Sequence, residues 1–177
     1  NYYFLKNDYA FTVARIQPDN NIELILSAFV KIKTIPIVFV GNWMNSTYGI
    51  KIKKRFSDMP NLILIEAIYA PRELNLLRSN CSIYIHGHSA GGTNPALLEA
   101  MNIQLPIYAY DCKFNRYTTE DKAKYFKDVH QLYELISKQK PEKLEENSIE
   151  MLKISKKRYI WEKITDEYAN VIDKSFL

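Results

Sequence analysis

Cysteine is scarce in this chain, and the cysteines present do not form a metal-binding pattern. Cys81 and Cys112 are the only cysteines among 177 residues, and no C-x-x-C or Cys/His spacing typical of a zinc site occurs. Each thiol lies in or beside an apolar run, so we expect both to be reduced and buried. We therefore predict no metal site and no resident cofactor.

Long apolar runs and long basic runs are also missing. No stretch approaches the roughly 18 apolar residues that span a bilayer, and no signal peptide opens the chain. The formal net charge is only +4, and acidic and basic residues are interleaved, which argues against nucleic acid as a partner. This mild excess suits an anionic ligand, an anionic membrane surface or simple solubility, and the composition leaves these open.

Apolar runs alternate along the chain with amphipathic helical patterns. The apolar runs predict strands at residues 10–16, 35–40, 62–65, 81–85, 106–110 and 124–126. Helices are predicted from a cap at Asn20, with Glu23 as its capping-box partner, and at residues 48–56, from 71, 94–102, 129–137 and from 141. Because most of the strands are continuously apolar, both faces of the sheet should be covered. The predicted fold for residues 1–177 is one α/β domain with a Rossmann-like, doubly wound parallel sheet.

The end of the chain carries an apolar stripe at helical spacing. The stripe consists of Trp161, Ile164, Tyr168 and Val171. Such a stripe should pack against another part of the protein. Just before it lies a basic cluster, formed by Lys153, Lys156, Lys157 and Arg158. That cluster would either contact anionic lipid or remain a solvated helix face.

The most informative segment is HGHSAGGTNPALLEAM, residues 86–101, which follows a predicted buried strand. Its glycines would allow the backbone to approach a ligand closely. Asn94 suits a helix N-cap and Pro95 the first helical turn, so the helix should begin at the carboxyl end of a parallel strand. That position favours phosphate, and Glu99, one turn inside the helix, would then accept hydrogen bonds from a ribose. The alternative is a plain strand–loop–helix connection with Glu99 solvated.

The run GTNPALLEAM, together with the following Pro106, resembles the carboxylate signature of family 4 glycosyltransferases, which have the GT-B fold. In that family two glutamates stand eight positions apart, and the second holds the ribose. The resemblance therefore gives Glu99 this role. The first glutamate, which touches the donor sugar, would fall at Gly91, so the chain departs from the family there. His88, or the backbone of Gly91 and Gly92, would have to substitute for it.

A second match is Arg15, in ARIQPDNN at the end of the first predicted strand. The family has an arginine here and a basic residue five positions later, both gripping the donor diphosphate. The resemblance thus predicts that Arg15 binds the diphosphate, while the second position is occupied by Asn20. The alternatives are that Arg15 pairs with a local carboxylate and that Asn20 only caps a helix.

Further segments resemble bacterial rhamnosyltransferase-type enzymes that build capsule or O-antigen chains. These segments are GNW at 41–43, HGHS at 86–89 running into GGTNP, and NRYTTE at 115–120. By this resemblance Trp43, Thr93, Asn94 and Arg116 join the substrate-binding residues, although a tryptophan such as Trp43 is more often part of a core. The chain would work in the cytoplasm, with possible peripheral contact at the inner face of the bacterial membrane.

The predicted function is the donor-binding domain of a retaining hexosyltransferase that uses a nucleoside-diphosphate sugar. Arg15 and Glu99 would be its catalytic residues, and its acceptor would be a surface polysaccharide or lipid-linked oligosaccharide. No Asp-x-Asp motif occurs, which agrees with charge neutralisation by Arg15 and helix N–H groups instead of a metal. The chain begins at Asn1 without a methionine, so we expect a segment before it. The resemblance implies that this segment is the acceptor-binding domain and that the isolated fragment is inactive. It also implies that the last helix crosses to that domain, which would leave part of its apolar stripe exposed in this chain. Two rivals stay open: another GT-B enzyme such as a sugar-nucleotide epimerase, and a non-catalytic nucleotide-binding domain.

Overall fold

The structure is a computed structural model that describes residues 2, 8–161, 163–165, 168–169 and 172. Its centre is a six-stranded sheet in the order β3-β2-β1-β4-β5-β6, and every pairing is parallel. The strands are β1 (Ala10–Val13), β2 (Ile37–Gly41), β3 (Leu62–Glu66), β4 (Ile83–His86), β5 (Ile107–Tyr110) and β6 (Lys124–Phe126). The order reverses between β1 and β4, which confirms the predicted Rossmann-like, doubly wound fold.

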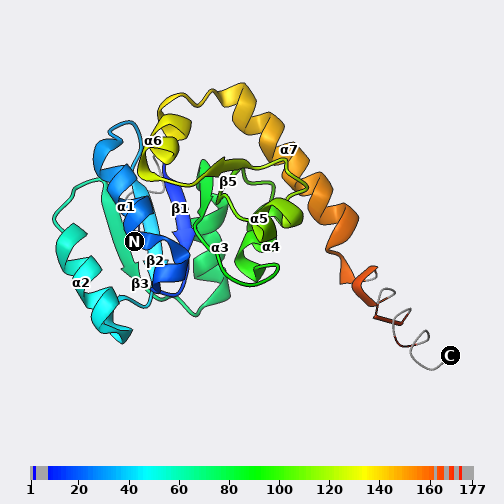
Figure 1. The fold of residues 1–177 in the computed structure, drawn as a ribbon, viewed down its shortest axis with the longest axis horizontal. Coiled ribbons are helices and arrows are strands. Elements are labelled where there is room, and N and C mark those ends of the chain that lie inside the picture. The colour runs from blue at the N-terminus through cyan, green and yellow to red at the C-terminus, as the bar shows by residue number, and fades with distance from the viewer. Residues whose placement is uncertain (1, 3–7, 162, 166–167, 170–171, 173–177) are drawn as a thin grey trace.

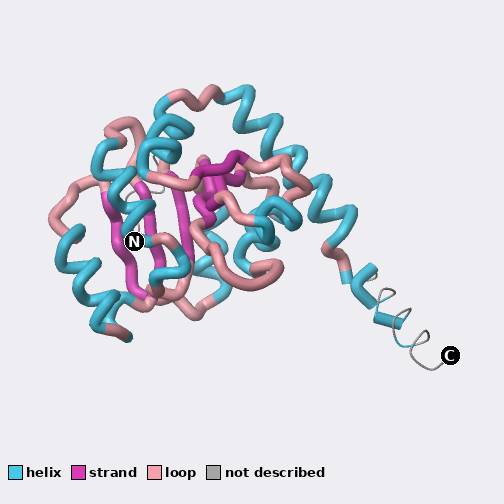
Figure 2. Tube along the Cα trace, viewed as in Figure 1, coloured by secondary structure: helices cyan, strands magenta, loops and turns pink. Residues whose placement is uncertain are grey.

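Helices cover both faces of the sheet (Figures 1 and 2). They are α1 (Ile22–Lys31), α2 (Thr47–Phe56), α3 (Pro71–Ser79), α4 (Pro95–Asn102), α5 (Lys113–Thr118), α6 (Val129–Ser137) and α7 (Pro141–Arg158). One core cluster joins α1, α2 and α6 to one face, and the other joins α3, α4 and α7 to the opposite face. Successive residues of β4 alternate between the two clusters, with Ile83 and Ile85 in the first and Tyr84 in the second. The continuous apolar runs are therefore explained by burial of both faces.

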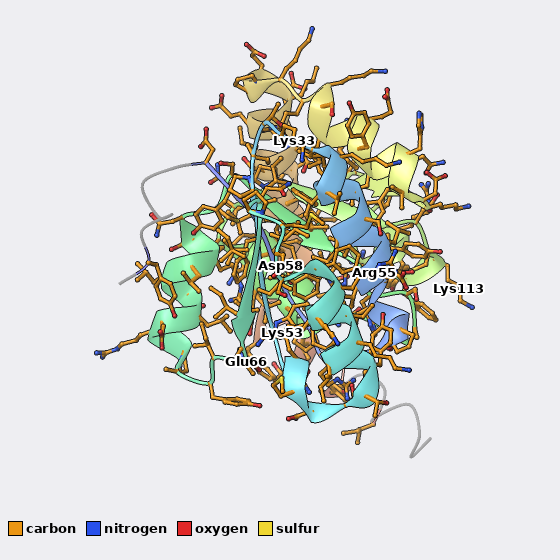
Figure 3. The ribbon with its side chains drawn as sticks, turned by 90° about the vertical axis from the view of Figure 1, so that its left-hand side faces the viewer. Lys33, Lys53, Arg55, Asp58, Glu66 and Lys113 are labelled. Atoms are coloured by element: carbon orange, nitrogen blue, oxygen red, sulfur yellow. The ribbon has the colours of Figure 1, made fainter. Side chains whose placement is uncertain are left out.

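The edge of the sheet near β3 is tied to α2 by charged side chains. Lys53 of α2 and Glu66 at the end of β3, both labelled in Figure 3, form an ion pair with a 2.5 Å N–O distance. Arg55 of α2 pairs with Glu23 of α1, so the basic face of α2 is partly neutralised locally. Both pairs are largely exposed, and exposed pairs of this kind contribute little to stability.

The start of α1 differs from the sequence prediction. β1 ends at Val13, a short 3-10 turn occupies Pro18–Asn20, and α1 begins only at Ile22. Asn21, with a φ of 50°, stands at the cap position and makes no side-chain cap bond. Glu23 is engaged with Arg55, so the predicted capping box is wrong. The turn brings Asn20 against Gly87 and His88, just after β4, and these contacts outweigh local capping preference.

Most other strands and helices begin and end close to the predicted residues, and one helix was not predicted. β6 and α6 have the predicted bounds, and the loop at 87–93 follows the carboxyl end of the central strand β4, as expected. Helix α5 was not predicted from the sequence. It has six residues and its N-cap, Cys112, makes no side-chain cap bond, so there was little local signal to find.

The apolar stripe at the end of the chain is partly exposed, as predicted. The described residues after α7 lie on the part of the chain that projects from the sheet (Figure 1). Trp161 is 78% exposed and Tyr168 is 69% exposed. Val171, the last member of the predicted stripe, lies outside the described residues.

Candidate functional site

A cavity of about 590 Å³ opens at the carboxyl edge of the sheet, where the strand order reverses. In open α/β sheets, ligands bind at this switch point. The cavity runs along the ends of β3, β2, β1 and β4, which at about 4.8 Å per strand spans about 15 Å. Its polar lining includes Arg15, Asn20, Asn42, Arg78, His86, His88, Asn94 and Glu99. Its apolar lining includes Val13, Val40, Ile68, Tyr69 and Leu74.

Two loops meet beside this cavity and are joined by hydrogen bonds. Ser89 donates from its backbone N–H and its hydroxyl to the carbonyl of Asp19, at 2.9 and 2.8 Å. Asn21 Nδ2 donates to the carbonyl of Gly87 at 2.8 Å. A Cβ at Gly87 would lie 2.2 Å from the Asn20 carbonyl oxygen, so only glycine allows this approach. The β1–α1 loop and the β4–α4 loop therefore form a single wall.

Asn20 is neither a helix cap nor an exposed anion ligand. It is 6% exposed, and its Nδ2 donates to the carbonyl of Arg15 at 2.8 Å. Its Oδ1 lies 2.9 Å from His88 Nδ1. Although Asn20 lines the cavity, both ends of its amide are thus engaged within the wall.

Arg15 lies at the cavity mouth as an exposed cation. No carboxylate in the described ranges pairs with its guanidinium, which sets aside the alternative of a local ion pair. The backbone around it is held by Asn20 on one side and by Asn42, whose Oδ1 accepts from the Ile16 N–H at 2.8 Å. An unpaired cation on an ordered loop is suited to bind an anionic ligand.

The first turn of α4 reaches the cavity, but its N–H groups are satisfied. Asn94 is the N-cap, as predicted, and its Oδ1 accepts from the Ala96 N–H at 2.9 Å. Pro95 has no N–H, and Leu97 donates to the Asn94 carbonyl. The helix N–H groups that were expected to help neutralise the ligand's charge are therefore bonded within the first turn. In the described part of the chain, the N–H groups of residues 90–94 just before the helix have no partner.

Glu99 lies in the cavity and has a partner that the sequence did not indicate. Its Oε2 accepts from Arg78 Nη2 of α3 at 2.6 Å. The Arg78 side chain is 3% exposed, whereas that of Glu99 is 55% exposed. Arg78 Nη1 also donates to Asn75 Oδ1 at 3.0 Å. Glu99 therefore presents a carboxylate to the cavity while it neutralises a buried cation on the neighbouring helix.

His86 forms part of the buried floor beneath the loop. It is 4% exposed and its ring stacks on that of Tyr84 with centroids 6.1 Å apart. Burial, together with the nearby His88, lowers the pKa of His86 to about 3. The imidazole is therefore neutral near pH 7 and adds no charge to the cavity.

Some predicted site residues lie away from the cavity. Trp43 is fully buried, packs edge-on against Phe39 and donates from Nε1 to the Ile65 carbonyl at 2.9 Å, so no face remains for a ligand. Arg116 forms ion pairs with Asp111 and Asp121 and is not among the cavity-lining residues. We therefore leave Trp43 and Arg116 out of the proposed site.

The exposed loop residues Gly91, Gly92 and Thr93 also do not line the cavity directly. Gly91 has a φ of 83°, a conformation that favours glycine. Sequence reasoning missed Arg78, Asn42 and the apolar patch of Ile68, Tyr69 and Leu74. Asn42 lies in the GNW segment at 41–43, but that segment did not indicate a role for it. Leu74 and Arg78 lie on α3, and Ile68 and Tyr69 lie on the connection before it, so only this crossover brings those four residues to the site.

Neither a metal cluster nor a spanning helix is found in the part of the chain that the structure describes. No group of three or more His, Cys, Asp or Glu side chains there is arranged to hold a metal ion. None of the described helices is long and apolar enough to cross a membrane.

Comparisons with known proteins agree on the fold. The family model described as "Glycosyl transferases group 1" matches residues 4–167. No curated protein sequence matches the chain. Among solved structures, TarM matches with a TM-score of 0.75 and 16% identity over 93% of this chain and 36% of its own. HepE from Anabaena, in complex with UDP-glucose, has a TM-score of 0.81 and 13% identity, covering 96% of this chain and 50% of its own.

A third structure is itself an isolated domain. It is the C-terminal domain of a group 1 glycosyl transferase, LpcC from Francisella tularensis, with a TM-score of 0.68 and 14% identity over 86% of this chain and 87% of its own. By contrast, this chain spans only about a third of TarM and half of HepE.

Proposed function

This chain belongs to the group 1 glycosyl transferases, and we propose that it is the domain that binds the nucleoside-diphosphate sugar donor. The proposal rests on one observation: the same cavity is lined by two groups, Arg15 and Glu99, that suit two different parts of such a ligand. Arg15 is a cation without a carboxylate partner among the described residues, and Glu99 is a half-exposed carboxylate held by Arg78. A diphosphate needs the first group and the hydroxyls of a ribose suit the second.

The order of groups along the sheet edge matches such a ligand. The apolar side chains of Ile68, Tyr69 and Leu74 lie at the β3 side and suit a nucleobase. Arg15 follows β1 and would hold the diphosphate, assisted by the positive end of α4 near Asn94. The donor sugar would then lie at the β4 side, near His88.

The chemistry proposed is transfer with retention of the sugar's anomeric configuration. The bond between the sugar's anomeric carbon and the diphosphate oxygen breaks, and its electron pair leaves with the diphosphate. An acceptor hydroxyl oxygen forms the new bond with the anomeric carbon, and its proton passes to the leaving diphosphate. Arg15 would stabilise the charge that develops on the leaving diphosphate, and tight positioning would supply much of the remaining rate acceleration.

The acceptor would be bound by a second domain, because the chain spans only part of the length of TarM and HepE. We propose a hexosyltransferase of bacterial surface-polysaccharide assembly, of the rhamnosyltransferase type, acting in the cytoplasm at or near the membrane. The isolated chain should bind a nucleoside diphosphate weakly and transfer no sugar, since a GT-B active site lies between two domains.

A thermal-shift panel of UDP, GDP, dTDP and CMP tests the proposal. One of the diphosphates should raise the melting temperature in a concentration-dependent way, because a ligand that binds only the folded state stabilises it. Arg15→Ala should markedly reduce the shift at the same nucleotide concentration without changing the melting temperature of the free protein. If no nucleotide shifts the melting curve of the wild type, the proposed donor site is wrong.

A further inference from the structure

His88 is held in a fixed orientation by groups from the turn at Pro18–Asn20 and from helix α5. Its backbone carbonyl accepts from Asn115 Nδ2 at 2.8 Å. Its ring nitrogen Nδ1 lies 2.9 Å from Asn20 Oδ1 and 3.9 Å from Asp19 Oδ2. The side chain is 16% exposed and lines the cavity. The imidazole therefore has little freedom to rotate.

The hydrogen bonds around Asn20 determine which nitrogen of His88 carries the proton. The carbonyl oxygen of Arg15 can only accept, so the amide group 2.8 Å from it has to be the Asn20 NH₂. The amide oxygen then faces His88, and it too can only accept. His88 Nδ1 must therefore be the donor, and the carboxylate of Asp19 favours the same arrangement. In the neutral ring the other nitrogen, Nε2, is left as an acceptor.

His88 Nε2 has no partner in the part of the chain that the structure describes. The His88 side chain lines the cavity and is 16% exposed. Even a Cβ built at the neighbouring Gly91 would be only in ordinary van der Waals contact with this nitrogen, at 3.9 Å. The ring nitrogen thus belongs to a side chain that lines the β4 side of the cavity, and it keeps its acceptor capacity for a ligand.

We propose that His88 Nε2 accepts a hydrogen bond from a hydroxyl of the donor sugar and that Asn20 is the positioning residue that sets its tautomer. The proposal rests on the proposed function for the presence of a sugar at this end. A neutral Nε2 acceptor repels phosphate oxygens, which are acceptors themselves, and attracts hydroxyl groups. His88 would therefore favour the sugar at its side of the cavity, while Arg15 binds the diphosphate.

Nitrogen-15 NMR of the histidine side chains in the free protein tests the tautomer. At pH 7.5 we expect a protonated, pyrrole-like Nδ1 and an unprotonated, pyridine-like Nε2 for His88. In Asn20→Ala the preference for Nδ1–H should be lost, whereas Asn21→Gly, which removes the neighbouring bond to Gly87 and relieves a positive φ, should keep it. A protonated Nε2 in the wild type, alone or together with Nδ1, would overturn the proposal, and this result does not depend on any nucleotide.

Titration with UDP-glucose and with UDP, or with the matching pair if the panel selects another base, tests the sugar contact. The sugar nucleotide should move the His88 Nε2 resonance, and the nucleoside diphosphate alone should not. His88→Asn retains an amide donor toward Asn20 and removes the acceptor at the Nε2 position. It should weaken binding of the sugar nucleotide by about two- to tenfold and leave that of the diphosphate unchanged.

The outcomes separate the two proposals. If the backbone resonance of Arg15 responds to both ligands while His88 Nε2 responds to neither, the sugar contact is wrong and the donor site stands. If no resonance of the cavity responds to any nucleotide, the proposed function fails and the sugar contact fails with it, whatever the tautomer.

Discussion

Replacing Glu99 with glutamine tests two roles of this residue. Its carboxylate faces the cavity, where it would bind a ribose, and it also neutralises the buried Arg78. The variant keeps the shape and one acceptor oxygen but loses the charge. A charge-assisted hydrogen bond to a ribose hydroxyl contributes about 1.5–3 kcal/mol. Since each 1.4 kcal/mol is about a factor of ten, nucleoside diphosphate affinity should fall at least about tenfold.

The same substitution should lower stability, because the Arg78 guanidinium is almost completely buried. Removing one partner of a fully buried ion pair costs about 3–5 kcal/mol. Glu99 is 55% exposed, so water compensates for part of that loss, and we expect a cost of about 1–2 kcal/mol. For a domain of this size, that corresponds to a decrease of about 2–8 °C in melting temperature.

Calorimetric titration and melting curves of both proteins measure the two effects, and a 2′,3′-dideoxy nucleotide isolates the ribose contact. Removing the ribose hydroxyls should weaken binding to the wild type and have little further effect on Glu99→Gln. Glu150→Gln is the matched control, because it breaks an exposed pair with Lys153 on α7 and should change neither quantity appreciably. Equal nucleotide affinities for wild type and Glu99→Gln would refute the ribose role. An unchanged melting temperature would refute the structural role of the pair.

Three further predictions concern diphosphate binding and the wall beside the cavity. Arg15→Ala should weaken nucleoside diphosphate binding about tenfold or more by calorimetry, since a charge-assisted contact is lost, whereas Lys33→Ala at a distant exposed site should not. Gly87→Ala should destabilise the fold by several degrees in a melting curve, because its Cβ would meet the Asn20 carbonyl at 2.2 Å; Gly92→Ala, whose Cβ meets nothing within 4 Å, should melt nearly as the wild type does. Diphosphate affinity should be the same with and without EDTA, and a strict requirement for a divalent ion would contradict neutralisation by Arg15.

Local patterns in the sequence were sufficient to predict the parallel sheet and the residue at which α4 begins. Continuous apolar runs predicted parallel strands covered on both faces, because such runs tolerate water on neither side. Asn94 and Pro95 predicted the helix start, since a cap depends on neighbours within one turn. For the same reason Glu99 could be placed near the end of β4 before any tertiary contact was known.

Only the tertiary structure decided what several polar side chains bind. Asn20 looked like a helix cap, but the turn it occupies packs against the loop that follows β4, and its amide joins Arg15 to His88 instead. Arg78 and Glu99 are 21 positions apart on separate helices, and the crossover of α3 brings them together. Hydrogen bonds and ion pairs between distant segments leave no periodicity in the sequence, because their partners are set by how the helices cross the sheet.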